Sequence, residues 1–177
     1  MNSTLVIVTA VGTAIDLPVR VTIAEAILTT GLVTGVVSLY AHTIMPGLRG
    51  TDDRTFVAAF QGIDRAIINP WFMSCFFAPL ALIGVSVALT WGRAGAVTAW
   101  LIAALMLYLA AVVITVTIHV PRNDAMKAAG DVGGIPDLAR TRADFDEARW
   151  ARWNVVRTLA CLVSLCCLLW ANLLVPG

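Results

Sequence analysis

The chain has 177 residues, of which 59% are apolar and only 13% are charged, and its mean hydropathy is +0.86. Soluble domains carry about 25% charged residues, so this composition excludes an ordinary soluble domain and indicates a membrane protein. The formal net charge is +1, and no basic patch is interleaved with aromatic residues, so nucleic acid is not an expected partner.

The first twenty residues form an N-terminal segment ahead of the main membrane domain. Residues 5–15 are apolar, but this run is short for a bilayer crossing and is closed by Asp16 and Pro18. It also lacks the basic start and the small-residue cleavage site of a signal peptide. The sequence leaves open whether residues 1–20 cross the membrane or lie on it, and it predicts one domain over residues 21–177.

Four apolar runs in that domain are long enough to cross a hydrocarbon core, which takes roughly 20 helical residues. They lie at about residues 21–44, 71–91, 94–118 and 155–175. In lipid, only helices and closed barrels satisfy every backbone N–H and C=O group, and barrel strands would be shorter and alternating. We therefore predict an all-α fold, an integral membrane antiparallel four-helix bundle.

The connection between the first two spans contains a helix of its own. Thr51 is a suitable N-cap, and the acidic residues that follow it are favourable at the positive end of a helix dipole. Apolar residues then recur on one face, at Phe56, Val57, Phe60, Ile63 and Ile67. We expect an amphipathic surface helix over about residues 52–67, lying on the membrane or over the mouth of the bundle. Asn69 and Pro70 end it and begin the second span.

The connection between the third and fourth spans begins at Pro121, where we expect the third span to close. Glycines at residues 130, 133 and 134 mark a turn region, and from about Asp137 the sequence becomes helical and charged. We expect this last helix to run on into the fourth span.

Lys and Arg residues are divided unevenly between the two sides of the predicted bundle. The two long connections carry nine of them, namely Arg49, Arg54, Arg65, Arg122, Lys127, Arg140, Arg142, Arg149 and Arg152, against Arg20 and Arg93 on the opposite side. Because cytoplasmic loops are enriched in Lys and Arg, both long connections are predicted to be cytoplasmic.

Two histidines fall at matching ends of their spans, His42 at the end of the first and His119 at the end of the third. The predicted topology puts both imidazoles at one depth on one side of the membrane. If the two helices are neighbours, the imidazoles suit a proton-transfer pair or two ligands of a metal such as copper, iron or zinc. The alternative is that each histidine forms a hydrogen bond at the membrane interface.

The start of the fourth span carries the strongest polar pattern. Trp150, Asn154 and Arg157 share one helical face by their i, i+4, i+7 spacing, and Trp153 adjoins that face. A guanidinium beside an amide and an indole suits a clamp for an anion or a carbonyl. The alternative is an interfacial aromatic belt with snorkelling arginines, which gives no reason for Asn154. Asn123, shortly after Pro121, is either a turn residue or a further member of this site.

Four segments together resemble one known family. Thr43-Ile44-Met45-Pro46-Gly47-Leu48, Asn69-Pro70-Trp71-Phe72, Val120-Pro121-Arg122-Asn123 and Arg149-x-x-Arg152-Trp153-Asn154-x-x-Arg157 resemble motifs of the small four-helix membrane proteins of the DUF1772 family. That family includes the fungal anthrone oxygenases. The resemblance covers nearly the whole chain from Val21 onward.

The resemblance implies a membrane-bound oxygenase or oxidase that acts on an apolar aromatic or polycyclic small molecule. Such chemistry needs a base, a clamp for the substrate anion and an apolar slot. For this chemistry we expect His42, His119, Asn123, Asn154 and Arg157 as catalytic residues and Tyr40, Trp150 and Trp153 as substrate-binding residues. In the variant with a bound metal, His42 and His119 would be its ligands; this variant follows from their predicted positions and not from the resemblance.

Two points stay open at this level. The reaction needs either no cofactor beyond dioxygen or a histidine-bound copper or iron, and the sequence does not choose between them. The expected partners are membrane lipid, the apolar substrate and a further copy of the chain in a homo-oligomer. The alternative function is a non-catalytic membrane scaffold or accessory subunit, which predicts that conservative changes at these polar positions leave function intact.

Overall fold

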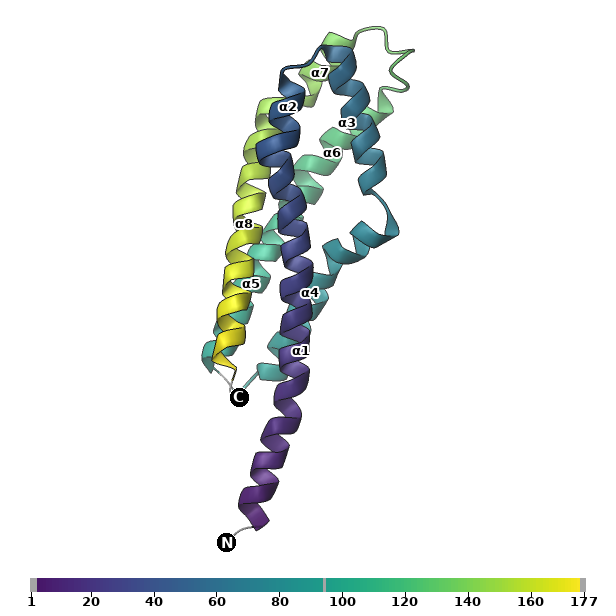
Figure 1. Cartoon of the computed structure of the whole chain (residues 1–177). Helices are drawn as coiled ribbons and strands as arrows, with labels where there is room; N and C mark the ends of the chain where they lie inside the picture. The colour runs from purple at the N-terminus through teal and green to yellow at the C-terminus, as the bar shows by residue number, and fades with distance from the viewer. Residues whose placement is uncertain (1–2, 94, 176–177) are drawn as a thin grey trace.

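The computed structural model describes residues 3–93 and 95–175, with side chains of the first helix described from Leu17 onward. These residues are helical or lie in turns, and no strand occurs among them, so the all-α prediction is confirmed (Figure 1). The elements are α1 Ser3–Leu39, η1 Tyr40–Ile44, α2 Met45–Arg49, α3 Asp53–Ile67, α4 Pro70–Thr90, α5 Gly95–Ile114, η2 Thr115–His119, α6 Val120–Ala128, α7 Leu138–Phe145 and α8 Glu147–Leu174, where η denotes a π-helical turn.

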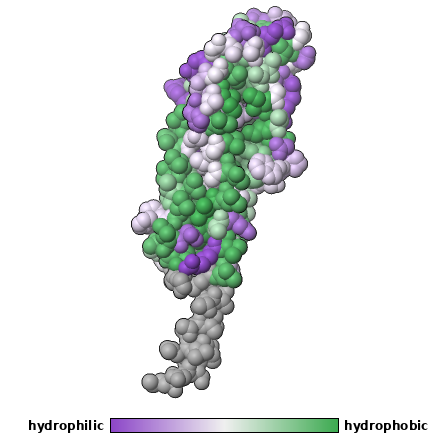
Figure 2. Space-filling model, in the orientation of Figure 1, coloured by the Kyte–Doolittle hydropathy of each residue, from purple (hydrophilic) through white to green (hydrophobic). Residues whose placement is uncertain are grey.

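Four stretches are long and apolar enough to cross a membrane: Leu17–Arg49, Pro70–Thr90, Gly95–Ala128 and Leu138–Leu174. The chain is therefore a multi-pass membrane protein. In the bundle, α1 packs on α4 and α8, and α5 packs on α4 and α8. Figure 2 shows a broad hydrophobic band between two ends that carry hydrophilic residues, of which the upper end has the larger share. That upper end is the hydrophilic end of the molecule.

That hydrophilic end is formed by α2, α3, α6, α7 and the start of α8, and we call it the head. It lies at the end of the bundle opposite the C-terminus (Figure 1). A second core fills it, with Phe56, Phe60, Phe145 and Trp150 among its buried side chains. The head is thus a small folded unit set on the membrane bundle.

The helix predicted between the first two spans is present as α3, but its expected N-cap was wrong. The N-cap is Asp52 rather than Thr51, because the Asp52 carboxylate accepts a hydrogen bond from the Thr55 N–H at 3.0 Å. Hydrogen bonds from the Thr55 hydroxyl and N–H lower the pKa of Asp52. The helix packs on α6 and α7 and buries Phe56 and Phe60 in the head, which agrees with the predicted place over the mouth of the bundle.

The first and third spans do not end where the prolines predicted. The chain stays helical through Pro46 and Pro121, as far as Arg49 and Ala128. In each case a π turn ends two residues before the proline, and the amides of Met45 and Val120 bond to carbonyls five residues back. A proline ring clashes with the carbonyl four residues before it in a regular helix. The wider turn relieves that clash, so both helices continue into the head.

The predicted single helix from Asp137 into the fourth span is also divided. Asp137 caps α7 as expected, but Asp146 adopts a left-handed conformation with φ of 53° and separates α7 from α8. Aspartate tolerates this conformation better than most residues, and its side chain accepts a hydrogen bond from the Arg149 N–H at 3.2 Å. The break lets Phe145 turn into the head core.

The second span begins as predicted, because Asn69 caps α4 and Pro70 occupies its first turn. At the other end of the molecule, α1 is continuous through residue 20, so the N-terminal apolar run and the first span belong to one helix. The side chains of residues 3–16 lie outside the described part of the chain. The prediction that this segment either crosses or lies on the membrane therefore concerns side chains that are not described.

Candidate functional site

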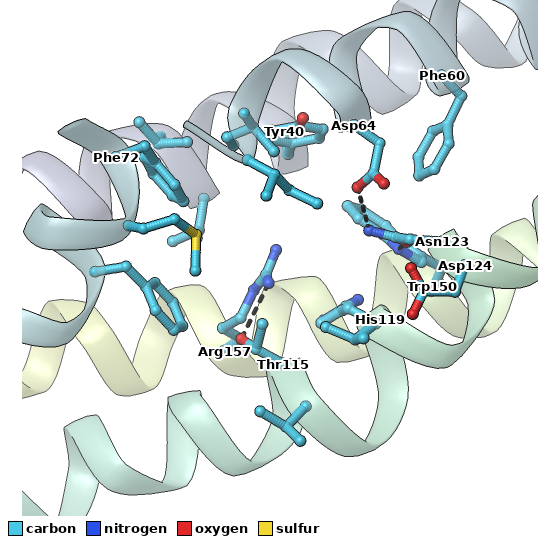
Figure 3. Close-up of a pocket in the computed structure, with 18 of the residues that line it drawn as sticks. Tyr40, Phe60, Asp64, Phe72, Thr115, His119, Asn123, Asp124, Trp150 and Arg157 are labelled. Atoms are coloured by element: carbon cyan, nitrogen blue, oxygen red, sulfur yellow. Dashed lines mark hydrogen bonds between the residues drawn. The ribbon is translucent and has the colours of Figure 1, made fainter. Parts of the chain in front are cut away.

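A cavity of about 200 Å³ lies where the bundle meets the head. Its walls come from the end of α1, the first half of α4, the C-terminal end of α3, η2 with α6, and the start of α8. Most of the wall is apolar, with Val36, Val37, Phe72, Met73, Phe76 and Phe77 among its members. The polar lining residues include Asp64, Thr115, His119, Asn123 and Arg157 (Figure 3). The cavity therefore combines an aromatic slot with a small polar cluster.

Arg157 is the most unusual group in this cavity. It is only 7% exposed, and its guanidinium donates hydrogen bonds to Asn154 Oδ1 at 2.6 Å and to Thr115 Oγ1 at 3.2 Å. Asn154 is itself held by a bond from its Nδ2 to the Val37 carbonyl at 3.1 Å. None of the ion pairs formed by the described residues includes Arg157.

A buried cation without a carboxylate partner is costly in an apolar bundle. The two neutral acceptors orient the Arg157 guanidinium but leave its charge uncompensated. The arrangement is therefore suited to receive an anion or a developing oxyanion from a ligand in the cavity.

His119 lies on the same wall, with 1% of its surface exposed. Among the described residues, neither ring nitrogen has a hydrogen-bond partner, and the ring meets Trp150 edge-on at a centroid distance of 4.7 Å. The π turn η2 spans both Thr115 and His119 and places both in the cavity lining. A buried imidazole with both nitrogens unpartnered is available for proton transfer with a bound ligand.

Asn123 links the site to the head. It accepts a hydrogen bond from Trp150 Nε1 at 2.9 Å and donates one to Asp64 Oδ1 at 2.6 Å. The other Asp64 oxygen is 2.8 Å from Lys127 Nζ, which also pairs with Asp124 at 3.0 Å. This chain of contacts fixes Trp150 and closes the polar side of the cavity.

Comparison with known proteins adds a family to this geometry. The sequence model of a family described as anthrone oxygenase matches residues 71–167, more than half of the chain. The chain belongs to the anthrone oxygenase family. No curated protein and no solved structure is significantly similar to it. The part that matches the anthrone oxygenase family contains His119, Asn123, Trp150 and Arg157, whereas Tyr40 and Asp64 reach the cavity from outside it.

The structure brings most of the predicted site residues of this anthrone oxygenase family member together. Tyr40, His119, Asn123, Trp150 and Arg157 line the cavity. Asn154 is fully buried directly behind Arg157 and positions it.

Two predicted residues are placed elsewhere. His42 is exposed, with its Nδ1 2.6 Å from the Thr43 hydroxyl, and it does not line the cavity. Trp153 is 36% exposed and is also absent from the cavity wall. His42 is two positions from Tyr40 and therefore points to a different side of its helix. Trp153 is three positions from Trp150, so it lies at the edge of the same face and stays partly exposed.

The predicted metal site does not fit this arrangement. His42 faces outward while His119 is buried, and the residues that the structure describes contain no group of three or more His, Cys, Asp or Glu side chains able to hold a metal ion. No step of the chemistry below is therefore assigned to a protein-bound metal.

Sequence reasoning missed Asp64 and Lys127. A signal for Asp64 was present, because it lies four residues after Phe60 on the buried face of α3, where a carboxylate interrupts an apolar stripe. A buried carboxylate needs polar partners. Asn123 donates a hydrogen bond to one oxygen of Asp64, and Lys127 forms an ion pair with the other. Lys127 gave no comparable signal, because the expected end of the helix at Pro121 placed it in a loop.

Proposed function

We propose that the chain is an integral membrane oxygenase that oxidises a flat, apolar, anthrone-like small molecule with dioxygen. The observation that carries this proposal is the uncompensated Arg157 guanidinium, which lines an aromatic cavity together with the unpartnered imidazole of His119. Membership of the anthrone oxygenase family supports the reaction class.

The chemistry starts with removal of a proton. An anthrone has an acidic methylene group opposite its carbonyl, and in our proposal His119 accepts one methylene proton. The negative charge then spreads over the ring system onto the carbonyl oxygen. Arg157 stabilises this oxyanion, with Asn154 and Thr115 holding the guanidinium in place.

The electron-rich anion then reacts with dioxygen. A bond forms between the former methylene carbon and one oxygen atom, which gives a hydroperoxide after protonation. Loss of water, with the second hydrogen of that carbon, leaves a quinone carbonyl. One oxygen atom of dioxygen enters the product and the other leaves as water, and the substrate itself supplies all the electrons.

In this proposal the aromatic side chains of the cavity bind the substrate and take no part in the reaction. Phe72, Phe76 and Trp150 contribute ring surfaces to the cavity, which favour a flat polycyclic ligand by stacking and by exclusion of water. In a site with little water, the attraction between Arg157 and the oxyanion is stronger than it would be in bulk solvent.

Orientation is part of the same proposal. Nine Lys and Arg residues lie in the two long connections against two at the opposite end, which supports a cytoplasmic head. Single cysteines are placed at Thr51 and Gly133 in a cysteine-free background and treated with a membrane-impermeant reagent. Both should react in inside-out vesicles and not in intact cells. Reaction of both positions in intact cells would mean that the head faces outward.

The deciding experiment follows oxygen uptake by the purified protein in lipid nanodiscs supplied with anthrone. Arg157→Met should lower turnover by roughly 10²–10³, the loss expected for one well-placed oxyanion donor. Arg152→Met is its matched control, because Arg152 is an exposed arginine on the same helix and should keep full activity. His119→Gln should likewise lose activity, and His42→Gln should not.

Anthrone also oxidises without a catalyst, so the rate in empty nanodiscs is subtracted. Uptake above that background that is equal in wild type, Arg157→Met and His119→Gln would exclude the proposed mechanism. Absence of any uptake above background by the wild-type protein, for anthrone and for hydroxylated anthrones, would favour the membrane scaffold instead.

A further inference from the structure

The mouth of the cavity can be located from residues that both line it and reach the surface. Four apolar residues meet both conditions: Ile68 is 58% exposed, Phe77 49%, Val116 55% and Val120 40%. Ile68 lies just before α4, and Phe77 lies on α4. Val116 lies in η2, and Val120 is the first residue of α6. The cavity therefore opens sideways, between α4 and the η2–α6 segment.

Most of this opening borders stretches that are candidate membrane spans. Phe77 lies in Pro70–Thr90 and Val116 in Gly95–Ala128, whereas Ile68 precedes the first of these spans and Val120 lies where α6 enters the head. Trp71 is 64% exposed at the first turn of α4, a position typical of an indole at the membrane interface. Phe77 follows six residues later, about 9 Å further along the helix, and therefore lies below that interface in the hydrocarbon region.

The head end of the cavity wall is held together by polar contacts. Asp64 is 6% exposed and is tied to Asn123 at 2.6 Å and to Lys127 at 2.8 Å. An apolar ligand that came through the head would have to separate this ion pair and leave its charges without partners. The sideways opening is apolar at Phe77, Val116 and Val120, with the exposed Asp124 at its head end. A ligand that enters beside the apolar residues separates no ion pair.

We propose that a flat aromatic ligand enters and leaves the cavity directly from the lipid, through a window between α4 and η2–α6 whose rim is formed by Phe77 and Val116. The ligand class rests on the proposed function. The route rests on the exposure of the apolar rim residues and on the Asp64–Lys127 ion pair that a ligand passing through the head would have to separate. Both observations are independent of the reaction.

The test measures ligand exchange rather than turnover. Anthraquinone is used as a flat tricyclic probe that cannot undergo the oxidation, and its binding to protein in lipid nanodiscs is followed by stopped-flow quenching of tryptophan fluorescence. Val116→Trp narrows the window and should slow association and dissociation alike by about tenfold, with Kd changed by less than about twofold.

Val113→Trp is the matched control. Val113 lies on the preceding turn of α5, is 50% exposed and does not line the cavity, so the same added indole should leave both rates at wild-type values. A second pair widens the window instead: Phe77→Ala should speed both rates, while Val85→Ala, at a lipid-facing position 47% exposed on α4, should not. This pair serves if Val116→Trp does not accumulate.

The outcomes separate the window from the chemistry. Equal rates in Val116→Trp and Val113→Trp, together with equal rates in Phe77→Ala and Val85→Ala, would overturn the lateral route. Failure of the wild-type protein to bind anthraquinone saturably would overturn the aromatic ligand class. Window-dependent exchange in a protein that shows no oxygen uptake would support the route and refute the proposed function.

Discussion

The membrane bundle is surrounded by lipid and the head largely by water, and the cores of the two regions differ accordingly. In lipid there is no hydrophobic driving force between helices, so close packing and a few hydrogen bonds hold the spans together. In water, removal of apolar surface from solvent is the main favourable contribution. Residues from the same continuous helices take part in both cores.

The bundle core consists mainly of aliphatic and small residues. Leu101 and Ala104 are fully buried on α5, and Ser164 of α8 donates a hydrogen bond to the Ala104 carbonyl at 2.8 Å. Tyr108 reaches across to the Phe76 carbonyl of α4 at 2.8 Å. Small residues and hydroxyl groups thus let the helix backbones approach each other closely, as is typical of packing in membranes.

The head core is aromatic and is framed by charges. Phe60 contacts Phe145 at a ring-centroid distance of 4.5 Å and Trp150 at 5.9 Å. Arg142 lies 4.3 Å above the Phe56 ring and pairs with Asp53 and Glu147. Aromatic rings bury a large apolar area per residue, and a unit as small as the head needs this buried area for its stability.

The cavity lies at the boundary between these two regions, and both π turns border it. Tyr40 and His119, at the edges of η1 and η2, face the cavity, and π turns inside helices occur frequently at functional sites. At this junction the helices depart from regular α-helical geometry, and the π turns place polar side chains in the cavity wall. Three predictions test how far the contrast between the two regions extends.

The largest effect is expected in the head core. Phe60→Ala should lower the free energy of unfolding by about 3–5 kcal/mol, because it loses both water-to-core transfer and aromatic packing. Leu101→Ala in the bundle should cost less, about 1–2 kcal/mol, because only packing is lost when the alternative environment is lipid. Denaturant unfolding in mixed micelles measures both values. Equal losses would mean that the two cores are not stabilised differently.

An intermediate effect is expected at the polar side of the cavity. Asp64→Ala should cost about 2–3 kcal/mol, because it leaves Lys127 and Asn123 without their shared partner. The Asp124 side chain, which also pairs with Lys127, is 60% exposed. Asp124→Ala should therefore cost less than about 1 kcal/mol. Hydrogen exchange of α3 and α6 reports the loss locally. A larger effect at Asp124 would contradict the assignment of Asp64 as the structural partner.

The smallest effect is expected from a single hydrogen bond inside the bundle. Ser164→Ala removes the bond to the Ala104 carbonyl with little change in volume, and should cost about 0.6 kcal/mol, the average for such bonds between membrane helices. The same unfolding assay detects it as a small shift of the midpoint. A loss as large as that of Asp64→Ala would show that one hydrogen bond contributes as much to the stability of the bundle as the Asp64 contacts contribute to the head.

The sequence alone predicted several features that depend on neighbours along one helix. Apolar run lengths located the four spans, Asn69 and Pro70 began the second, and the spacing of Trp150, Asn154 and Arg157 put all three on one buried face. These features follow from backbone geometry and local capping, which a few adjacent residues are enough to specify.

The tertiary structure decided which groups meet. Asn123 finds Asp64 across 59 positions of sequence, and Asn154 finds the Val37 carbonyl across 117. Whether Pro121 ends a helix depended on a π turn that local rules for proline do not anticipate, and the exposure of His42 depended on the side from which α1 meets its neighbours. Contacts of this range are chosen by the packing of whole helices against one another, and no short stretch of sequence contains that information.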